Sequence, residues 1–162
     1  MEDVFVRPME EPDISAVSGM FTALYEYLHE LGSLLRLNND WLSDYLPMML
    51  DTKLGRIFTL VSNGEVAGFI CVSAQKINRK FVTGDAKLIG MISELYIDPS
   101  HRGKSYARML LSAAGDYFDS LGIRRVQVEV IPGNRAAASL YESSGFAPGY
   151  TCMNKILQGR GC

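Results

Sequence analysis

The order of β-rich and helix-forming segments constrains the fold of this chain more than any other feature. Two β-rich runs, Arg56–Val61 and Val66–Ile77, are joined by "SNGE", and Asn-Gly is a strong hairpin signal. A third β-rich run follows at Leu88–Ile97, and helix and strand patterns alternate after it. This order predicts an α/β (α+β) fold with a mixed, mostly antiparallel sheet of about six to seven strands and helices on both faces.

The remaining elements follow from hydrophobic periodicity and from helix-ending residues. A short strand is expected at Val4–Arg7, and a helix is expected after Pro12 and Asp13, with apolar residues at steps of three and four. The other expected elements are a short helix from Asp40 towards Leu50, an amphipathic helix from Tyr106 to Leu121, a strand at Arg124–Ile131, a helix at Arg135–Ser144, and a last strand or hairpin within Phe146–Ile156.

Length and charge narrow the classes of protein to which the chain can belong. At 162 residues we expect one domain over residues 1–162. The net charge of −2 disfavours a general nucleic-acid-binding role, so any phosphate binding must be local. The N-terminal segment lacks the apolar region of a signal peptide, and no apolar run approaches a membrane span. These features predict a cytoplasmic protein without a membrane partner.

Cysteine and histidine are too few and too scattered for a metal centre. Cys71, Cys152 and Cys162 have no metal-like spacing, which favours thiols in a reducing compartment. Only His29 and His101 offer imidazole, so no metal site is expected.

The segment Arg102–Ala107 predicts an anion site at the start of a helix. Helix N-termini carry unpaired N–H groups and a partial positive charge, and small residues allow close approach to them. Arg102 and Lys104 add two cations beside Gly103 and Ser105. No P-loop and no dinucleotide fingerprint is present. From this segment alone, either a phosphate site or a helix with solvated basic neighbours remains open.

A second motif gives the segment a context. In "VEVIPGNRAAASLYESSGF" a strand is followed by Asn134 and by a helix that carries Tyr141 and ends near Gly145. Together with "ELYIDPSHRGKSYARMLL", this resembles the GNAT superfamily of acyl-CoA-dependent N-acetyltransferases. The resemblance is close over about Leu88–Phe146 and follows the element order of the whole chain. Arg102–Ala107 matches the family's Gln/Arg-x-x-Gly-x-Gly/Ala signature, except that Ser105 replaces the usual glycine.

The resemblance implies acetyl-CoA as cosubstrate and an amine acceptor as the second small partner. By this resemblance, the pyrophosphate of acetyl-CoA would lie on the amides of Gly103–Ala107. The pantetheine arm of acetyl-CoA would pair with the preceding strand, as in β-augmentation. A homodimer is left open. The residues expected to contact the cofactor are Leu95, Tyr96, Ile97, Arg102, Gly103, Lys104, Ser105, Tyr106, Ala107 and Asn134.

Two residues are candidates for proton transfer. Glu94 lies on the strand before the signature, where alternation predicts one face for Glu94 and Tyr96. It is either the general base or a solvent-facing or paired carboxylate, and Glu129 is a weaker alternative. Tyr141 matches the family tyrosine near the CoA sulfur, which implies a general acid, although an apolar helix stripe also explains it. Asn134 either contacts the cofactor or serves only as a helix N-cap.

The sequence gives the least information on the acceptor amine. We expect its contacts within Met20–Leu50, with Tyr27 and Trp41 as binding residues. The primary function expected is transfer of acetyl to a primary amine, in the first place of a small molecule. A protein or peptide N-acetyltransferase and a non-catalytic acyl-CoA sensor are the alternatives.

Overall fold

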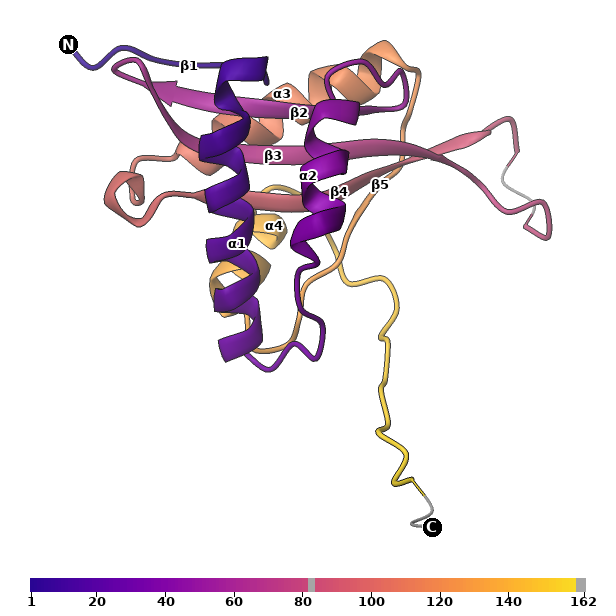
Figure 1. Ribbon diagram of the computed structural model, residues 1–162. Helices are drawn as coiled ribbons and strands as arrows, with labels where there is room; N and C mark the ends of the chain where they lie inside the picture. Colours follow the sequence, from indigo (N-terminus) through magenta and orange to yellow (C-terminus); the bar gives the residue numbers. More distant parts are fainter. Residues whose placement is uncertain (82–83, 160–162) are drawn as a thin grey trace.

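A five-stranded sheet organises the computed structural model, which describes residues 1–81 and 84–159 (Figure 1). The strands lie in the order β1-β2-β3-β4-β5; β4 and β5 are parallel, and the other neighbours are antiparallel. The elements in chain order are β1 (Val4–Pro8), α1 (Ile14–Glu30), α2 (Asn39–Met48), β2 (Gly55–Ser62), β3 (Glu65–Lys76), β4 (Leu88–Ile97), α3 (Tyr106–Ser120), β5 (Val126–Val128) and α4 (Arg135–Ser143), with short 3-10 turns at Glu11–Asp13 and Pro99–His101.

Helices cover both faces of the sheet, as expected. Alternate residues of β3 belong to two separate apolar clusters: Phe69 packs with α1 and α2, whereas Ile70 packs with α3. Figure 1 shows α1 and α2 in front of the strands and α3 behind them. A hydrogen bond of 2.9 Å from Arg108 Nη2 to Ser143 Oγ joins α4 to the start of α3. The predicted α/β class with a mixed sheet is confirmed.

The strand count was overestimated. The expected strand at Arg124–Ile131 is reduced to β5, which pairs with β4 only opposite Gly90–Ile92. The expected last strand within Phe146–Ile156 does not form, and residues 147–159 are exposed and irregular. Pro148 and Gly149 disfavour a strand there. The segment also lacks a long neighbouring strand on which to pair.

A β-bulge at Ser93 explains why β5 is short. Cys71 pairs with Glu94 and Val72 pairs with Ile92, so Ser93 has no partner residue on β3. A bulge bends its strand and increases the local twist. Beyond this point β4 has no partner on the β5 side within residues 1–81 and 84–159. The half of β4 that leads to α3 therefore has one free edge.

Three other sequence features can be compared with the structure. Among the described residues, no helix is both long and apolar enough to cross a bilayer. Cys71 is a buried free thiol and Cys152 is an exposed one. Cys162 lies outside the described residues.

The connection to α3 has left-handed backbone at two positions. Gly103 has a φ of +80°, and Ser105, the residue before the helix, has a φ of +62° and a ψ of +17°. A left-handed conformation costs about 1–2 kcal/mol for residues with a Cβ, and glycine avoids this cost. The serine in place of the usual glycine is therefore a strained residue rather than a helical one.

Replacing Ser105 with glycine should stabilise the fold. We expect Ser105→Gly to raise the free energy of unfolding by about 0.5–1 kcal/mol, because relief of strain exceeds the added entropy of the unfolded chain. Ser112→Gly is the matched control, since Ser112 is exposed within α3 and the same change there should cost about 0.5 kcal/mol. Urea denaturation measures the free energy of unfolding of both variants. Equal destabilisation by the two changes would contradict the strain at Ser105.

Candidate active site

Five consecutive backbone amides form a candidate anion-binding face at the start of α3, called the anion-binding face below. Within the described part of the chain, the N–H groups of Gly103–Ala107 have no acceptor. The turn that leads to these amides is fixed by Asp98, whose Oδ1 accepts a hydrogen bond from the Ser100 amide at 3.0 Å. Residues 102–105 are exposed, so the donors face solvent. These donors and the helix dipole suit a phosphate or pyrophosphate.

The two cations beside this face are engaged with other groups. Arg102 Nε donates to the Ile97 carbonyl at 2.9 Å, and its guanidinium lies 5.5 Å from the centre of the Tyr96 ring. Lys104 Nζ lies 2.9 Å from Glu2 Oε1. Exposed ion pairs contribute little to stability, so Lys104 can exchange Glu2 for another anion at small cost.

The free half of β4 lies directly before this face. Leu95, Tyr96 and Ile97 pair with β3 on one side, and no strand of the described part of the chain pairs with them on the other. Their outward backbone groups could pair with an extended ligand, as the sequence predicted. Arg102 already occupies the Ile97 carbonyl. The Asp98 amide donates to the Ala67 carbonyl, and successive residues of a strand direct their backbone groups to opposite edges, so those of Tyr96 point towards β3 and not, as expected, towards the cofactor. Leu95 is therefore the residue of the three whose outward N–H and C=O both remain for such pairing.

Glu94 is a buried carboxyl in the face covered by α1 and α2. Its exposed fraction is 9%, and the Tyr25 hydroxyl donates to Glu94 Oε1 at 2.7 Å. Burial raises the pKa of Glu94 above its ordinary value, although hydrogen bonds from Tyr25 and Cys71 oppose the rise. The sequence alternative of a solvent-facing glutamate is excluded. The alternative of a partnered glutamate is compatible with a catalytic role.

A chain of polar groups continues from Glu94 towards α2. Cys71 is its neighbour across β3 and β4, and the Cys71 Sγ lies 3.0 Å from the Tyr45 hydroxyl. Burial is the main cause that raises the pKa values of Cys71, Tyr45 and Tyr25, so all three stay protonated near neutral pH. Trp41 stacks on Tyr45 with ring centres 4.3 Å apart.

Sequence reasoning missed the roles of Tyr25, Tyr45 and Cys71. Tyr25 flanks the apolar stripe of α1, which signals partial burial but gives no partner. The antiparallel hairpin of β3 and β4 would place Cys71 beside Glu94 only if the bulge at Ser93 were known. Long-range register is therefore the information that the sequence pattern lacked.

Tyr141 is buried on α4 and its hydroxyl makes no hydrogen bond within residues 1–81 and 84–159. Its exposed fraction is 7%, and its ring packs edge-on against Phe146 at 5.5 Å. Burial raises the pKa of Tyr141 to about 12, with a further contribution from the Glu94 charge. Tyr141 therefore lies within electrostatic reach of Glu94.

The beginning of α4 lies close to the end of α1. The Asn134 side chain accepts from the Ala137 amide at 3.2 Å, which confirms the expected N-cap. A Cβ on Gly133 would lie 2.9 Å from the Leu31 carbonyl oxygen, so glycine is needed for this close approach. The α1 helix, β4 and α4 thus bring Tyr25, Glu94 and Tyr141 into one region.

The two expected acceptor residues have different surroundings. Trp41 is 47% exposed. It stacks on Tyr45, whose hydroxyl contacts Cys71, the neighbour of Glu94. Tyr27 is 38% exposed and lies on the other flank of α1 from Tyr25. The structure therefore does not bring Tyr27 to Glu94. Glu129, the weaker base candidate, is exposed.

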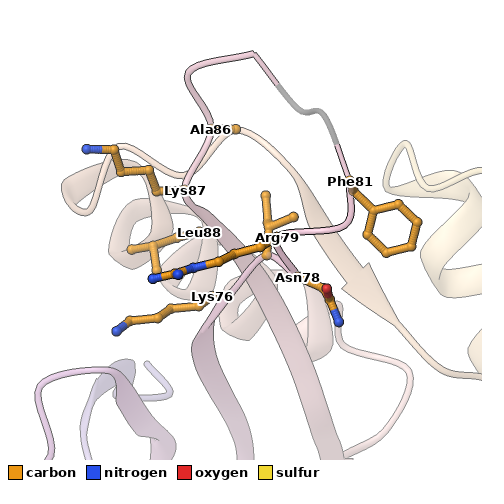
Figure 2. A pocket seen from close by; sticks show the side chains of 8 residues that line it. Lys76, Asn78, Arg79, Phe81, Ala86, Lys87 and Leu88 are labelled. Carbon is orange, nitrogen blue, oxygen red and sulfur yellow. The ribbon is translucent and has the colours of Figure 1, made fainter.

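A hollow on the surface lies away from these residues. It has a volume of about 500 Å³ and includes Lys76, Arg79, Phe81, Lys87 and Leu88 in its lining (Figure 2). These residues sit at the tip of the β3–β4 hairpin, at the opposite end of β4 from Ile97. No cluster of three or more potential metal ligands occurs among the residues that the structure describes.

Known proteins resemble this chain in both sequence and fold. The uncharacterized N-acetyltransferase YhfO of Bacillus subtilis (strain 168) is 26% identical over 141 residues, covering 87% of this chain and 88% of the relative. Spermidine N(1)-acetyltransferase of Vibrio cholerae serotype O1 is 32% identical over 99 residues, covering 51% of this chain and 57% of that protein. The aminoglycoside N-acetyltransferase AAC(6')-Iy, solved in complex with CoA, superposes with a TM-score of 0.78 at 17% identity over 99% of this chain and 97% of its own.

A family model extends the likeness over both motifs described above. The model of the acetyltransferase (GNAT) family matches residues 21–146, which include β4, the start of α3 and Tyr141. The match covers more than half of the chain, and the five-stranded mixed sheet agrees with it. This chain is an N-acetyltransferase of the GNAT family.

Proposed function

We propose that the protein transfers acetyl from acetyl-CoA to the primary amine of a small molecule. The observation that carries the proposal is the row of unpaired amides at Gly103–Ala107, placed directly after the free edge of β4. The row of amides suits the pyrophosphate of CoA, and the free strand edge suits its extended pantetheine arm. The solved relative that holds CoA supports this choice of cosubstrate.

The cofactor contacts follow from this placement. The pyrophosphate lies on the amides from Gly103 to Ala107, and the pantetheine arm pairs with the outward backbone groups of Leu95. Lys104 leaves Glu2 to reach a phosphate, and Arg102 stays on the Ile97 carbonyl. Tyr106 is buried and supports the first turn of α3, and Asn134 acts through its cap on α4.

Glu94 acts as the general base. An alkyl ammonium with a pKa of about 10 is neutral roughly once in 10³ molecules at pH 7, which is a handicap of about 4 kcal/mol. The raised pKa of buried Glu94 makes it a stronger base than an exposed glutamate. Glu94 first takes one proton from the ammonium, which frees the lone pair of the nitrogen. The nitrogen then bonds to the acetyl carbon as the carbon–sulfur bond breaks, and the second proton that the nitrogen loses ends on the departing sulfur.

Tyr141 assists the departing sulfur. At a pKa of about 12 the phenol stays protonated at neutral pH and can donate a hydrogen bond to the thiolate. Complete proton transfer to a thiolate of pKa about 8.5 is uphill by about 5 kcal/mol. Stabilisation of the developing charge by the hydroxyl is therefore the main contribution of Tyr141, with protonation completed as the thiol leaves.

A cationic small molecule is the favoured acceptor. The site combines the buried carboxyl of Glu94 with the rings of Tyr25, Tyr45 and Trp41, and aromatic faces attract ammonium groups. One relative is named for spermidine and one structural neighbour for aminoglycosides, and both are amines of this kind. A protein N-terminus remains the alternative acceptor.

A panel of amines tests the proposal directly. We expect release of free CoA from acetyl-CoA to accelerate with polyamines, aminoglycosides or other small amines, and to be slower with peptides bearing a free N-terminus. The thiol of CoA is followed with a thiol reagent, and product mass confirms the added acetyl group. Turnover with peptides alone would favour the alternative, and tight acetyl-CoA binding without any turnover would favour a sensor.

The first substitution test concerns the leaving group. Tyr141→Phe should lower kcat by about 10²-fold while the affinity for acetyl-CoA, measured by calorimetry, stays the same. Tyr150→Phe is the control, because Tyr150 is 81% exposed in the irregular C-terminal segment. A phenylalanine variant at position 141 with the wild-type kcat would assign Tyr141 to the core only.

The second substitution test concerns the acceptor. Trp41→Ala should raise KM for the amine several-fold and leave the affinity for acetyl-CoA unchanged, since Trp41 lies on the α2 side of Glu94. Tyr27→Ala, measured beside it, tests the second expected acceptor residue on the far flank of α1. Equal weakening of amine and acetyl-CoA, in folded protein, would place the acceptor elsewhere.

A further inference from the structure

The environment of Glu94 contains neutral hydrogen-bond donors in place of a cation. Tyr25 of α1 donates to Oε1 at 2.7 Å, and Cys71 of β3 is the second hydrogen-bond partner of the carboxyl. Tyr45 of α2 contacts Cys71, and Tyr141 of α4 lies within electrostatic reach. Among the described residues, no Lys, Arg or His forms an ion pair with Glu94. Neutral groups alone therefore stabilise a buried negative charge.

Tyr25 is the stronger of the two donors. A hydroxyl that donates to a carboxylate forms a short, charge-assisted hydrogen bond, whereas a thiol is a weak donor. Tyr25 also stays protonated, because burial and the Glu94 charge raise its pKa. It can therefore donate over the whole pH range in which Glu94 changes its charge.

The ring of Tyr25 is held in place by apolar packing. It stacks on Phe21 with ring centres 6.5 Å apart and planes 9° apart, and Phe21 stacks on Phe69 of β3 at 4.7 Å. Phe21 and Phe69 are fully buried. This stack connects the hydroxyl rigidly to the same sheet that carries Glu94, so the hydrogen bond fixes the direction of the carboxylate.

We propose that Tyr25 is a positioning residue that holds the Glu94 carboxylate in its charged form and aimed at the acceptor amine. The inference rests on the proposed function, because it assumes that Glu94 removes the amine proton. Without the hydroxyl, one carboxylate oxygen is buried with no strong donor. The carboxyl then keeps its proton at a higher pH and is free to turn away from the amine.

The consequence for pH dependence has a definite sign. The hydrogen bond from Tyr25 lowers the pKa of Glu94 against the effect of burial. Removing the hydroxyl raises that pKa further. The acid limb of kcat/KM for the amine then moves to higher pH, because a larger fraction of Glu94 is protonated at each pH on that limb.

Tyr25→Phe tests the proposal, with Tyr117→Phe as the matched control. Tyr117 lies on α3, and its hydroxyl contacts the Lys53 carbonyl at 3.4 Å, far from Glu94. On the acid limb we expect Tyr25→Phe to lower kcat/KM by about tenfold, and above the limb by about threefold or less. The control should follow the wild-type profile. Thermal unfolding verifies that both variants are folded, and calorimetry verifies unchanged acetyl-CoA affinity.

A second readout does not depend on turnover. Isotope-edited infrared spectroscopy of protein labelled with ¹³C at glutamate carboxyls follows the ionisation of Glu94, assigned by the band lost in Glu94→Gln. The titration should move to higher pH in Tyr25→Phe. A variant whose rate profile superimposes on that of an active wild type would overturn the proposal, and so would an unshifted Glu94 titration. A wild type without acetyl transfer would instead refute the proposed function.

Discussion

The bulge at Ser93 in β4 is the constraint on which the arrangement of the site depends. It ends the pairing between β4 and β5 after Ile92, and thereby leaves a free strand edge before α3. It also changes which face each residue occupies: Ile92 packs towards α3, whereas Tyr96 packs towards α1 and α2. A regular strand would place both on one face. One extra residue thus creates both the edge and the buried position of Glu94.

The chemistry of the site follows from placing a carboxyl where water is scarce. Burial raises the pKa of Glu94, and a salt bridge with a cation would lower that pKa and make the carboxylate a poor base. Neutral donors from α1 and β3 give an intermediate result, in which the carboxyl can ionise and still attract a proton. The stacked rings of Phe21 and Phe69 hold α1, which carries the donor Tyr25, on the sheet.

The sequence predicted those parts of the molecule that depend on local pattern. The hairpin at "SNGE", the amphipathic helices and the N-cap at Asn134 follow from residues close to one another, and all are present. The bulge, the contact of Tyr25 with Glu94 and the absence of a last strand depend on register between distant segments. Periodicity carries no information on register. For the same reason Glu94 could be named as a candidate while its partners could not.

The contact between Lys104 and Glu2 joins the anion-binding face to a segment 102 residues earlier in the chain. An anion that draws Lys104 away removes one of the contacts of the Glu2 carboxylate, which also accepts from Ser62 Oγ at 3.2 Å. Occupancy of the site is thereby coupled to the position of the Glu2 side chain, while Asp3 stays hydrogen-bonded to Asn63. A reporter group attached at that end would sense the ligand, and a fusion partner attached there would crowd it. Residues 147–159 extend away from the sheet (Figure 1), so a group attached within them would lie away from the anion-binding face.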